Sequence, residues 1–263
     1  MKEKIFAKKS LGQHFLTSDR VLTRIVEAAE IMSNDTIFEI GPGTGNLTEK
    51  LLHSPAKIVI ACEKDDRLYF VLSEKYKSKR LKLIHQDALL LISNLRADSP
   101  LKVVANLPYN IAAPAIISLL SVCPTLPERL VVMVQKEVAE RIVAPPGNSN
   151  RGLLTVLLEL FAPPKILVKV SRGDFSPPPR VESAVIVLKD IKKPPFSAKD
   201  AIRVIKMAFA GKRKKIKNSL FSTLRIDPKR AAEIAKKCGF SLDQRPEELK
   251  KQEWMALIKV LVR

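Results

Sequence analysis

Short apolar runs alternate with amphipathic segments over the first 190 residues of the chain. The runs are rich in Val, Ile and Leu, which is typical of strands that are buried on both faces. Helical stretches lie between several of them, so the alternation predicts an α/β fold with a mainly parallel sheet covered by helices. The strands are predicted at residues 36–40, 57–62, 81–85, 101–105, 129–134, 166–170 and 181–188.

The pattern changes after the segment KDIKKPPFS at 189–197. From there on the apolar positions follow a helical period, and several segments begin with a proline or a capping residue. Helices are predicted at 198–209, 214–224, 228–238 and 246–262. The chain is therefore expected to hold two domains, an α/β domain at 1–190 and a small all-helical domain at 191–263.

Three features of the sequence limit the class of protein. No run of about 18 apolar residues occurs, so no membrane span is expected. The basic segment MKEKIFAKKSLGQHFL lacks the apolar stretch and cleavage site of a secretory signal. The cysteines, Cys62, Cys123 and Cys238, are odd in number and lack CxxC spacing, which predicts reduced thiols. We therefore expect a cytoplasmic protein with no metal site.

Charge is distributed unevenly along the chain. Lys and Arg number 46 against 27 for Asp and Glu, a net charge of +19. Residues 191–263 hold 20 basic and 7 acidic side chains, whereas residues 1–190 hold 26 and 20. A dense cluster, GKRKKIK at 211–217, favours a polyanion over a merely solvated surface, because each cation that meets a phosphate releases a counterion. The helical domain is therefore predicted to bind nucleic acid.

A glycine-rich turn joins the first predicted strand to a helix, in TIFEIGPGTGNLTEKLL at 36–52. Gly41, Gly43 and Gly45 let the backbone approach a ligand and present amides from the helix N-terminus. A dinucleotide site requires G-x-G-x-x-G, but Asn46 stands where the last glycine belongs. The spacing instead resembles the cofactor loop of S-adenosylmethionine-dependent methyltransferases, with their Rossmann-like sheet. A tight turn without a ligand remains the alternative.

Polar side chains end the next strands as well. The second strand ends at Glu63, which is suited to accept hydrogen bonds from two ribose hydroxyls. The third ends at Asp87, which can accept one from an adenine amino group while Ala88 helps to bury the ring. In an open α/β sheet these strand ends all face one crevice. Taken singly, each acid could equally be a turn residue or a helix cap.

The fourth strand ends in NLPYN at 106–110, and this motif suggests a reaction. The amino group of adenine is a poor nucleophile because its lone pair is delocalised into the ring. If the side-chain oxygen of Asn106 and the main-chain oxygen of Pro108 each accept one N–H bond, the amine is held with its lone pair towards a methyl donor. Tyr109 can stack on a base that has left its own stack. Alternatively, Asn and Pro simply end a strand.

Along nearly its whole length the sequence resembles the ribosomal RNA small-subunit adenine N6-dimethyltransferases, the kasugamycin-resistance methylases. The resemblance rests on KKSLGQHFL at 8–16, EIGPGTGNLT at 39–48, NLPYN at 106–110, VQKEVAERI at 134–142 and DFSPPPRVESAV at 174–185. It implies that Gln13, His14 and Leu16, at the end of an arm spanning 1–16, close over the cofactor, that Gly41, Glu63 and Asp87 bind it, and that Asn106 is catalytic and also lies against its methionine end. Phe175 would provide a second aromatic face for the base, although a core anchor explains that residue equally well.

The same resemblance implies a substrate: two adjacent adenines in a hairpin near the 3′ end of small-subunit (16S) rRNA, dimethylated during ribosome biogenesis. The partner is then this rRNA or the precursor of the small subunit, and the enzyme is expected to be a monomer. Arg151 and Leu154 depart from the family pattern, in a loop expected on the RNA side. The predicted RNA-binding residues are Arg180, Lys212, Arg213, Lys214, Lys215 and Lys217.

Two other functions stay open on the sequence. A DNA adenine N6-methyltransferase would use the same amide, proline and aromatic residue, but it needs a target-recognition region, and only residues 191–263 are available for one. A non-catalytic RNA-binding factor for ribosome assembly would not need an intact set of Glu63, Asp87 and Asn106. The segment at 231–249 also hints at a helix-turn-helix, although helix–glycine–helix arrangements are common in small helical domains.

Overall fold

The computed structural model describes residues 13–211 and 213–262, which divide into two compact units. The first unit contains the chain up to Ala139 together with Lys165–Ile191. The second contains Glu140–Pro164 together with the chain from Lys192 onward. The chain therefore enters the second unit, returns to the first, and then enters the second again.

The predicted boundary near residue 190 lies at the last of these crossings, whereas residues 140–164, which the prediction assigned to the first domain, belong to the second unit. Helix α7 (Leu153–Phe161) packs on α8 (Ala198–Phe209) and α10 (Lys251–Leu261). Six of its nine side chains are buried. An apolar helix is recognisable from sequence, but its hydrophobic period does not say which neighbours it will meet.

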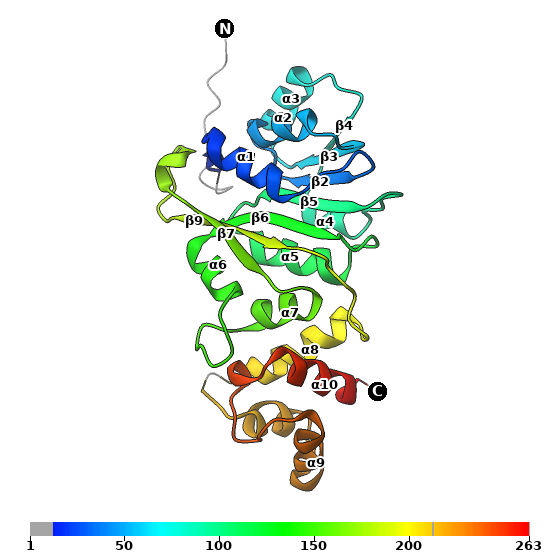
Figure 1. Ribbon diagram of the computed structural model, residues 1–263, viewed down its shortest axis with the longest axis vertical. Helices are drawn as coiled ribbons and strands as arrows, with labels where there is room; N and C mark the ends of the chain where they lie inside the picture. The colour runs from blue at the N-terminus through cyan, green and yellow to red at the C-terminus, as the bar shows by residue number, and fades with distance from the viewer. Residues whose placement is uncertain (1–12, 212, 263) are drawn as a thin grey trace. The chain divides into compact units, whose positions relative to one another are not determined.

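The first unit is built on a seven-stranded sheet in the order β4-β3-β2-β5-β6-β9-β7 (Figure 1). The first five strands in this order run parallel, and β9 runs antiparallel to both β6 and β7. This arrangement confirms the α/β fold and the mainly parallel sheet. The strands are β2 (Thr36–Ile40), β3 (Ile58–Glu63), β4 (Leu81–His85), β5 (Leu101–Asn106), β6 (Arg129–Gln135), β7 (Lys165–Val170) and β9 (Ser183–Leu188).

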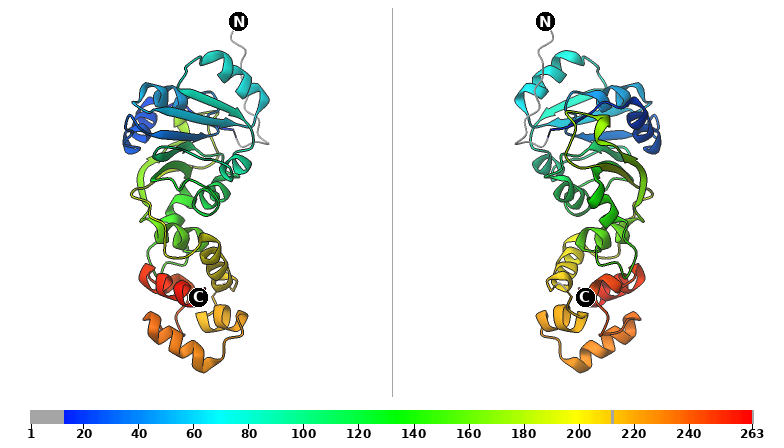
Figure 2. Two further views of the ribbon diagram at one scale, coloured as in Figure 1. Left: turned by 90° about the vertical axis from the view of Figure 1, so that its right-hand side faces the viewer. Right: turned by 90° about the vertical axis from the view of Figure 1, so that its left-hand side faces the viewer.

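Helices cover both faces of this sheet (Figure 2). On one face, α1 (Asp19–Ala28) and α2 (Asn46–His53) bury their leucines and isoleucines against β2, β5 and β6 in one hydrophobic cluster. On the other face, α4 (Ala88–Ile92) packs against α5 (Ala112–Ser121). Helix α3 (Asp66–Lys75) follows β3, and α6 (Lys136–Ile142) follows β6. Because each helix begins where a parallel strand ends, the polar strand ends gather at one edge of the sheet.

A second, two-stranded sheet was not predicted. Strand β1 (Phe15–Leu16) pairs antiparallel with β8 (Phe175–Ser176), with Leu16 opposite Phe175. A 3₁₀ turn, η2 (Arg172–Asp174), leads into β8. Strands of two residues carry no usable alternation, so only the three-dimensional structure reveals this pairing.

The second unit is helical, as predicted. In addition to α7, α8 and α10 it contains a π-helical turn, η3 (Lys217–Phe221), helix α9 (Pro228–Cys238) and a 3₁₀ turn, η4 (Pro246–Glu248). Trp254 is fully buried and stacks on Phe209, with ring centroids 6.0 Å apart. The helix predicted at 246–262 begins only at Lys251, because η4 occupies the first turn.

Within the described residues, no helix has both the length and the apolar character that a membrane crossing requires.

Candidate active site

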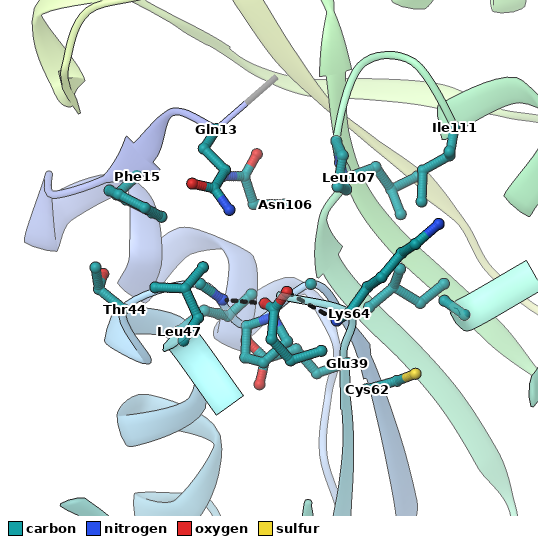
Figure 3. A pocket seen from close by; sticks show the side chains of 18 of the residues that line it. Gln13, Phe15, Glu39, Thr44, Leu47, Cys62, Lys64, Asn106, Leu107 and Ile111 are labelled. Atoms are coloured by element: carbon teal, nitrogen blue, oxygen red, sulfur yellow. Dashed lines mark hydrogen bonds between the residues drawn. The ribbon is translucent and has the colours of Figure 1, made fainter. Parts of the chain in front are cut away.

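A cavity lies at the carboxyl edge of β2, β3 and β5, within the first unit. Figure 3 shows Gln13, Phe15 and Asn106 along one side of it and Leu107 and Ile111 along another. Almost every predicted catalytic or cofactor residue lines this cavity, although the residues come from segments far apart in sequence. They are Gln13, His14, Leu16, Gly41, Gly43, Glu63, Asp87, Ala88, Asn106, Pro108 and Tyr109.

The glycine turn lines the cavity through Gly41 and Gly43. Gly41, Gly43 and Gly45 all have positive φ, between 60° and 86°, which side chains disfavour. A Cβ atom on Gly43 would lie 3.0 Å from the ring of Phe15, so the missing side chain lets β1 close over the turn. Gly45 does not line the cavity: it caps α2, and a Cβ there would lie 2.7 Å from the ring of Tyr76. Gly45 therefore permits close packing on Tyr76, and its contact with a cofactor stays a prediction.

Glu63 is held rigidly at the end of β3. One of its carboxylate oxygens accepts hydrogen bonds from the amides of Lys64 (2.8 Å) and Asp65 (2.9 Å), and the other accepts one from the amide of Gly43 (3.1 Å). Burial nevertheless raises its pKa above the ordinary value, because the side chain is only 6% exposed. The result is a preorganised acceptor that ties the glycine turn to the second strand.

Asp87 caps a helix, which is one of the two roles that the sequence left open, and it also forms an ion pair. One carboxylate oxygen caps α4 by accepting the amide of Leu89 at 2.9 Å. The other forms an ion pair with Lys64 at 2.8 Å. The hydrogen bond from Lys64 is the main reason that the pKa of Asp87 is lowered. The carboxylate thus stays charged at the rim of the cavity.

The segment from Gln13 to Leu16, which we call the strap, is fastened to several elements around the cavity. Gln13 donates to Asp65 at 2.9 Å, and Asn46 donates from its side chain to the main-chain oxygen of Leu16 at 2.7 Å. One ring nitrogen of His14 lies 2.9 Å from the main-chain oxygen of Pro177. These contacts place the strap against the glycine turn, and its closing over a cofactor stays a prediction.

Asn106 is oriented by the strap. Its amide nitrogen donates to the main-chain oxygen of His14 at 3.3 Å, which leaves the amide oxygen as the side chain's acceptor. The main-chain oxygen of Pro108 accepts the amide of Ile111 at 3.1 Å and retains a second lone pair. Two oxygen acceptors of the kind that the NLPY motif predicts therefore come from residues lining the same cavity.

Tyr109 is fixed from two sides. Its hydroxyl lies 2.8 Å from that of Ser183, and its ring stacks on the ring of His14, with centroids 5.9 Å apart and planes 27° apart. Burial raises the pKa of the phenol, so Tyr109 acts as a neutral aromatic surface. Phe175, in contrast, is only 4% exposed, belongs to the hydrophobic cluster and does not line the cavity. Phe175 is therefore part of the hydrophobic core, and its stacking on the base stays a prediction.

Sequence reasoning missed two ionisable residues of the site. Glu39, in the second-last position of β2, lines the cavity with an exposure of 1% and accepts a hydrogen bond from Thr48 at 2.7 Å. Burial raises the pKa of this carboxyl to about 8. Lys64, beside Glu63, also lines the cavity. An acid directly before the glycine turn was a usable signal for Glu39; nothing in the sequence marked Lys64.

The predicted RNA-binding residues are divided between the two units. Arg180 is exposed in the first unit. In the second unit Arg213 and Lys214 are exposed, whereas Lys215 and Lys217 both pair with Asp243 at 2.9 Å. Lys212 lies outside the described residues. Among the described residues, no group of three or more His, Cys, Asp or Glu side chains has the arrangement to hold a metal ion.

Comparison with known proteins identifies the family of this chain. The family model described as ribosomal RNA adenine dimethylase matches residues 5–262, nearly the whole chain. This chain belongs to the ribosomal RNA adenine dimethylase family. A relative named ribosomal RNA small subunit methyltransferase A, from Synechococcus sp. (strain CC9605), is 39% identical over 98% of this chain and 97% of its own length. The protein of the same name from Parasynechococcus marenigrum (strain WH8102) is 41% identical over 97% of this chain and 87% of its own.

Solved structures extend the family likeness to the fold. A dimethyladenosine transferase from Plasmodium falciparum superposes with a TM-score of 0.80 at 28% identity, covering 95% of this chain and 98% of its own. The 23S rRNA methyltransferase ErmE gives a TM-score of 0.72 at 25% identity, covering 95% and 100%. The adenine dimethylase chain therefore has a Rossmann-like methyltransferase domain with a helical part, as expected.

Proposed function

We propose that this protein transfers methyl groups from S-adenosylmethionine to the N6 amino groups of two adjacent adenines near the 3′ end of small-subunit rRNA. The observation that carries the proposal is the meeting of Glu63, Asp87, Asn106, Pro108 and Tyr109 at one cavity. Relatives of this chain at 39–41% identity, covering nearly its whole length, are named for the small subunit.

The residues around the cavity fit the cofactor. Glu63 offers a buried carboxylate to two ribose hydroxyls, and Asp87 offers a charged acceptor to the adenine amino group. Gly41 and Gly43 line the cavity and can present their main-chain atoms to the amino acid end of the cofactor. Gln13, His14, Leu16 and Ala88 complete the enclosure. Bound S-adenosylmethionine would supply an electrophilic methyl group on a sulfonium.

The protein's own residues position the target amine and the base that carries it. The oxygens of Asn106 and Pro108 accept the two N–H bonds of the target amine, which concentrates its lone pair on the side facing the methyl group. Because both acceptors are fixed before the substrate arrives, little reorganisation accompanies the reaction. Tyr109 stacks on the extruded base and holds it in plane. No covalent enzyme intermediate and no strong base are required.

The RNA partner is supported by charge. The second unit carries most of the excess of basic side chains, and Arg213 and Lys214 are exposed there. Such residues bind phosphates irrespective of sequence, and the pocket selects the base. We place the enzyme in the cytoplasm as a monomer that acts on the small subunit or its precursor.

The decisive experiment supplies labelled S-adenosylmethionine to the purified protein together with undermethylated small subunits, large subunits or duplex DNA. We expect label only in small subunits, on N6 of two adjacent adenines near the 3′ end of the rRNA. Labelled duplex DNA would favour a DNA methyltransferase, and labelled large subunits would favour the activity that the name of ErmE describes. Binding without any label would favour a non-catalytic assembly factor.

A further inference from the structure

Three strands beside the cavity bring basic residues to the same edge of the sheet. Strand β6 is parallel to β5, so Lys136, which follows β6, lies at the edge where Asn106 ends β5. Strand β9 is antiparallel to β6 and begins at that edge, directly after Glu182. Strand β7 is antiparallel to β9 and therefore ends there, with Lys169 next to its last residue and Arg172 two residues beyond its end.

Glu182 lies at the centre of this group. The Nζ atom of Lys136 lies 2.6 Å from its carboxylate, and the amide of Lys136 donates to its main-chain oxygen at 2.9 Å. Lys169 pairs with Ala184, so its side chain lies diagonally across from Glu182 on the same face of the sheet. Lys136 chiefly, and Lys169 and Arg172 more weakly, hold the pKa of Glu182 below its ordinary value. Three cations thus surround one carboxylate.

The group is coupled to the predicted base pocket through one hydrogen bond. Ser183, the residue after Glu182, lies with its hydroxyl 2.8 Å from that of Tyr109. Neighbouring strands are about 4.8 Å apart, so β6, β9 and β7 set these side chains roughly 5 to 15 Å from the strand of Asn106 along the edge. A nucleotide extruded towards Asn106 would bring its flanking phosphates to this edge of the sheet.

We infer that Lys136, Lys169 and Arg172 form a phosphate-binding site for the RNA strand next to the target adenine. The inference rests on the proposed function, and it adds RNA contacts within the first unit, where the sequence predicted only Arg180. A nucleotide leaves its stack by rotating about its own backbone, so cations that hold the flanking phosphates stabilise the extruded state. Lys169 and Arg172 are exposed, as such contacts require.

The location of these cations distinguishes a site from general surface charge. Lys165 lies on the same strand as Lys169 and is exposed as well, but it pairs with Val187, towards the opposite edge of the sheet. Four residues of strand separate the two lysines by roughly 13 Å. Lys165 is therefore a matched control of the same residue type, strand and exposure.

The test compares wild type, the double variant Lys169→Ala/Arg172→Ala, the control Lys165→Ala and the variant Glu182→Gln. RNA affinity is measured on the 3′ hairpin of small-subunit rRNA over a range of salt concentrations, and cofactor affinity is measured by calorimetry. In the double variant we expect affinity for RNA to fall about tenfold and the slope of log K against log salt to decrease by about 1.4 to 1.8, as for two lost phosphate contacts. Glu182→Gln should bind RNA more tightly than wild type. Lys165→Ala should have the RNA affinity and salt slope of wild type, and every variant should have the cofactor affinity of wild type.

An RNA affinity and salt slope in the double variant equal to those of Lys165→Ala would overturn the inference. Methyl transfer by wild type is assayed in the same preparations. If wild type methylates no RNA, the proposed function is wrong. The salt slopes then still show whether Lys169 and Arg172 contact phosphates. If wild type methylates small subunits and the slopes do not differ, only the phosphate site fails.

Discussion

The side-chain amide of Asn46 donates to the main-chain oxygen of Leu16 at 2.7 Å, which joins the first residue of α2 to strand β1. Asn46 stands where a dinucleotide-binding sequence has its third glycine, and a glycine cannot make this bond. The strap therefore depends on the same substitution that argued against a dinucleotide site. Because His14, in the strap, also orients Asn106, the bond indirectly supports the amide that we propose to be catalytic.

Loss of this bond should weaken cofactor binding. We expect Asn46→Ala to raise the dissociation constant for S-adenosylmethionine about three- to tenfold, since one hydrogen bond contributes about 1 kcal/mol. Asn46→Asp should do more harm, because a carboxylate would face the carbonyl oxygen of Leu16. Calorimetric titration measures both, with Asn94→Ala, an exposed asparagine near the end of α4, as the control. Unchanged affinity in both Asn46 variants would show that the strap closes without this bond.

Glu39 should make stability depend on pH. Its pKa is raised to about 8 in the folded protein from 4.5, so between these pH values the folded state holds a proton that the unfolded state has released. Stability should therefore decline as pH rises from about 4.5 to 8, and the decline should end above pH 8. In Glu39→Gln this decline should be smaller. At pH 8.5 the free energy of unfolding of the variant should exceed that of wild type by an amount on the order of a few kcal/mol.

Urea unfolding at pH 5.5, 7 and 8.5 measures this dependence for wild type and Glu39→Gln. Because Thr48 donates the hydrogen bond to Glu39, a glutamine oxygen can still accept it. Parallel pH profiles for the two proteins would contradict the account of Glu39 as a buried neutral acid.

Arg151 should contribute strongly to the stability of the second unit. It is 4% exposed, pairs with both oxygens of Glu159 at 2.7 and 2.9 Å, and donates to the main-chain oxygens of Ala144 and Leu249. Arg151→Met leaves these acceptors without a donor and should lower the free energy of unfolding by about 3–5 kcal/mol. The double variant Arg151→Met/Glu159→Leu should recover part of the loss. A loss below about 1 kcal/mol in chemical denaturation of the single variant would rule out this role.

Arg213 and Lys214 should bind RNA electrostatically. Reversing both charges to Glu should weaken RNA binding and reduce its salt slope, since two phosphate contacts are lost. The control reverses Lys57 and Lys79, exposed residues that precede β3 and β4 at the edge opposite the cavity. Both variants change the net charge equally. Equal binding curves for the two would mean that net charge matters and the position of these cations does not.

The parts of this fold that follow from local sequence were predictable. Strands β2 and β4 and helices α8 and α9 have the predicted bounds, because each is an apolar run or an amphipathic period with clear ends. The glycine turn and the acids at strand ends could be placed at one edge because parallel strands direct their carboxyl ends the same way. Family likeness then supplied the roles of the strap, which no periodicity indicated.

The features that the sequence did not predict depend on contacts between segments far apart in the chain. The pairing of Leu16 with Phe175 involves strands too short to show alternation, and both residues lie in the hydrophobic cluster. Helix α7 joined the second unit because its apolar face meets α8 and α10. Arg151 was noted only as a departure from the family pattern, since the burial of its ion pair with Glu159 is a property of the fold.

The central claim is that Asn106 provides one of two acceptors that hold the target amine. The most direct test is the single-turnover rate of methyl transfer from labelled S-adenosylmethionine to undermethylated small subunits, for wild type and Asn106→Ala, with particle binding measured in parallel. We predict a rate at least a hundredfold lower in the variant, with particle affinity nearly unchanged, because a preorganised hydrogen-bonding group at the reacting centre is lost. Equal rates for the two proteins would contradict the account.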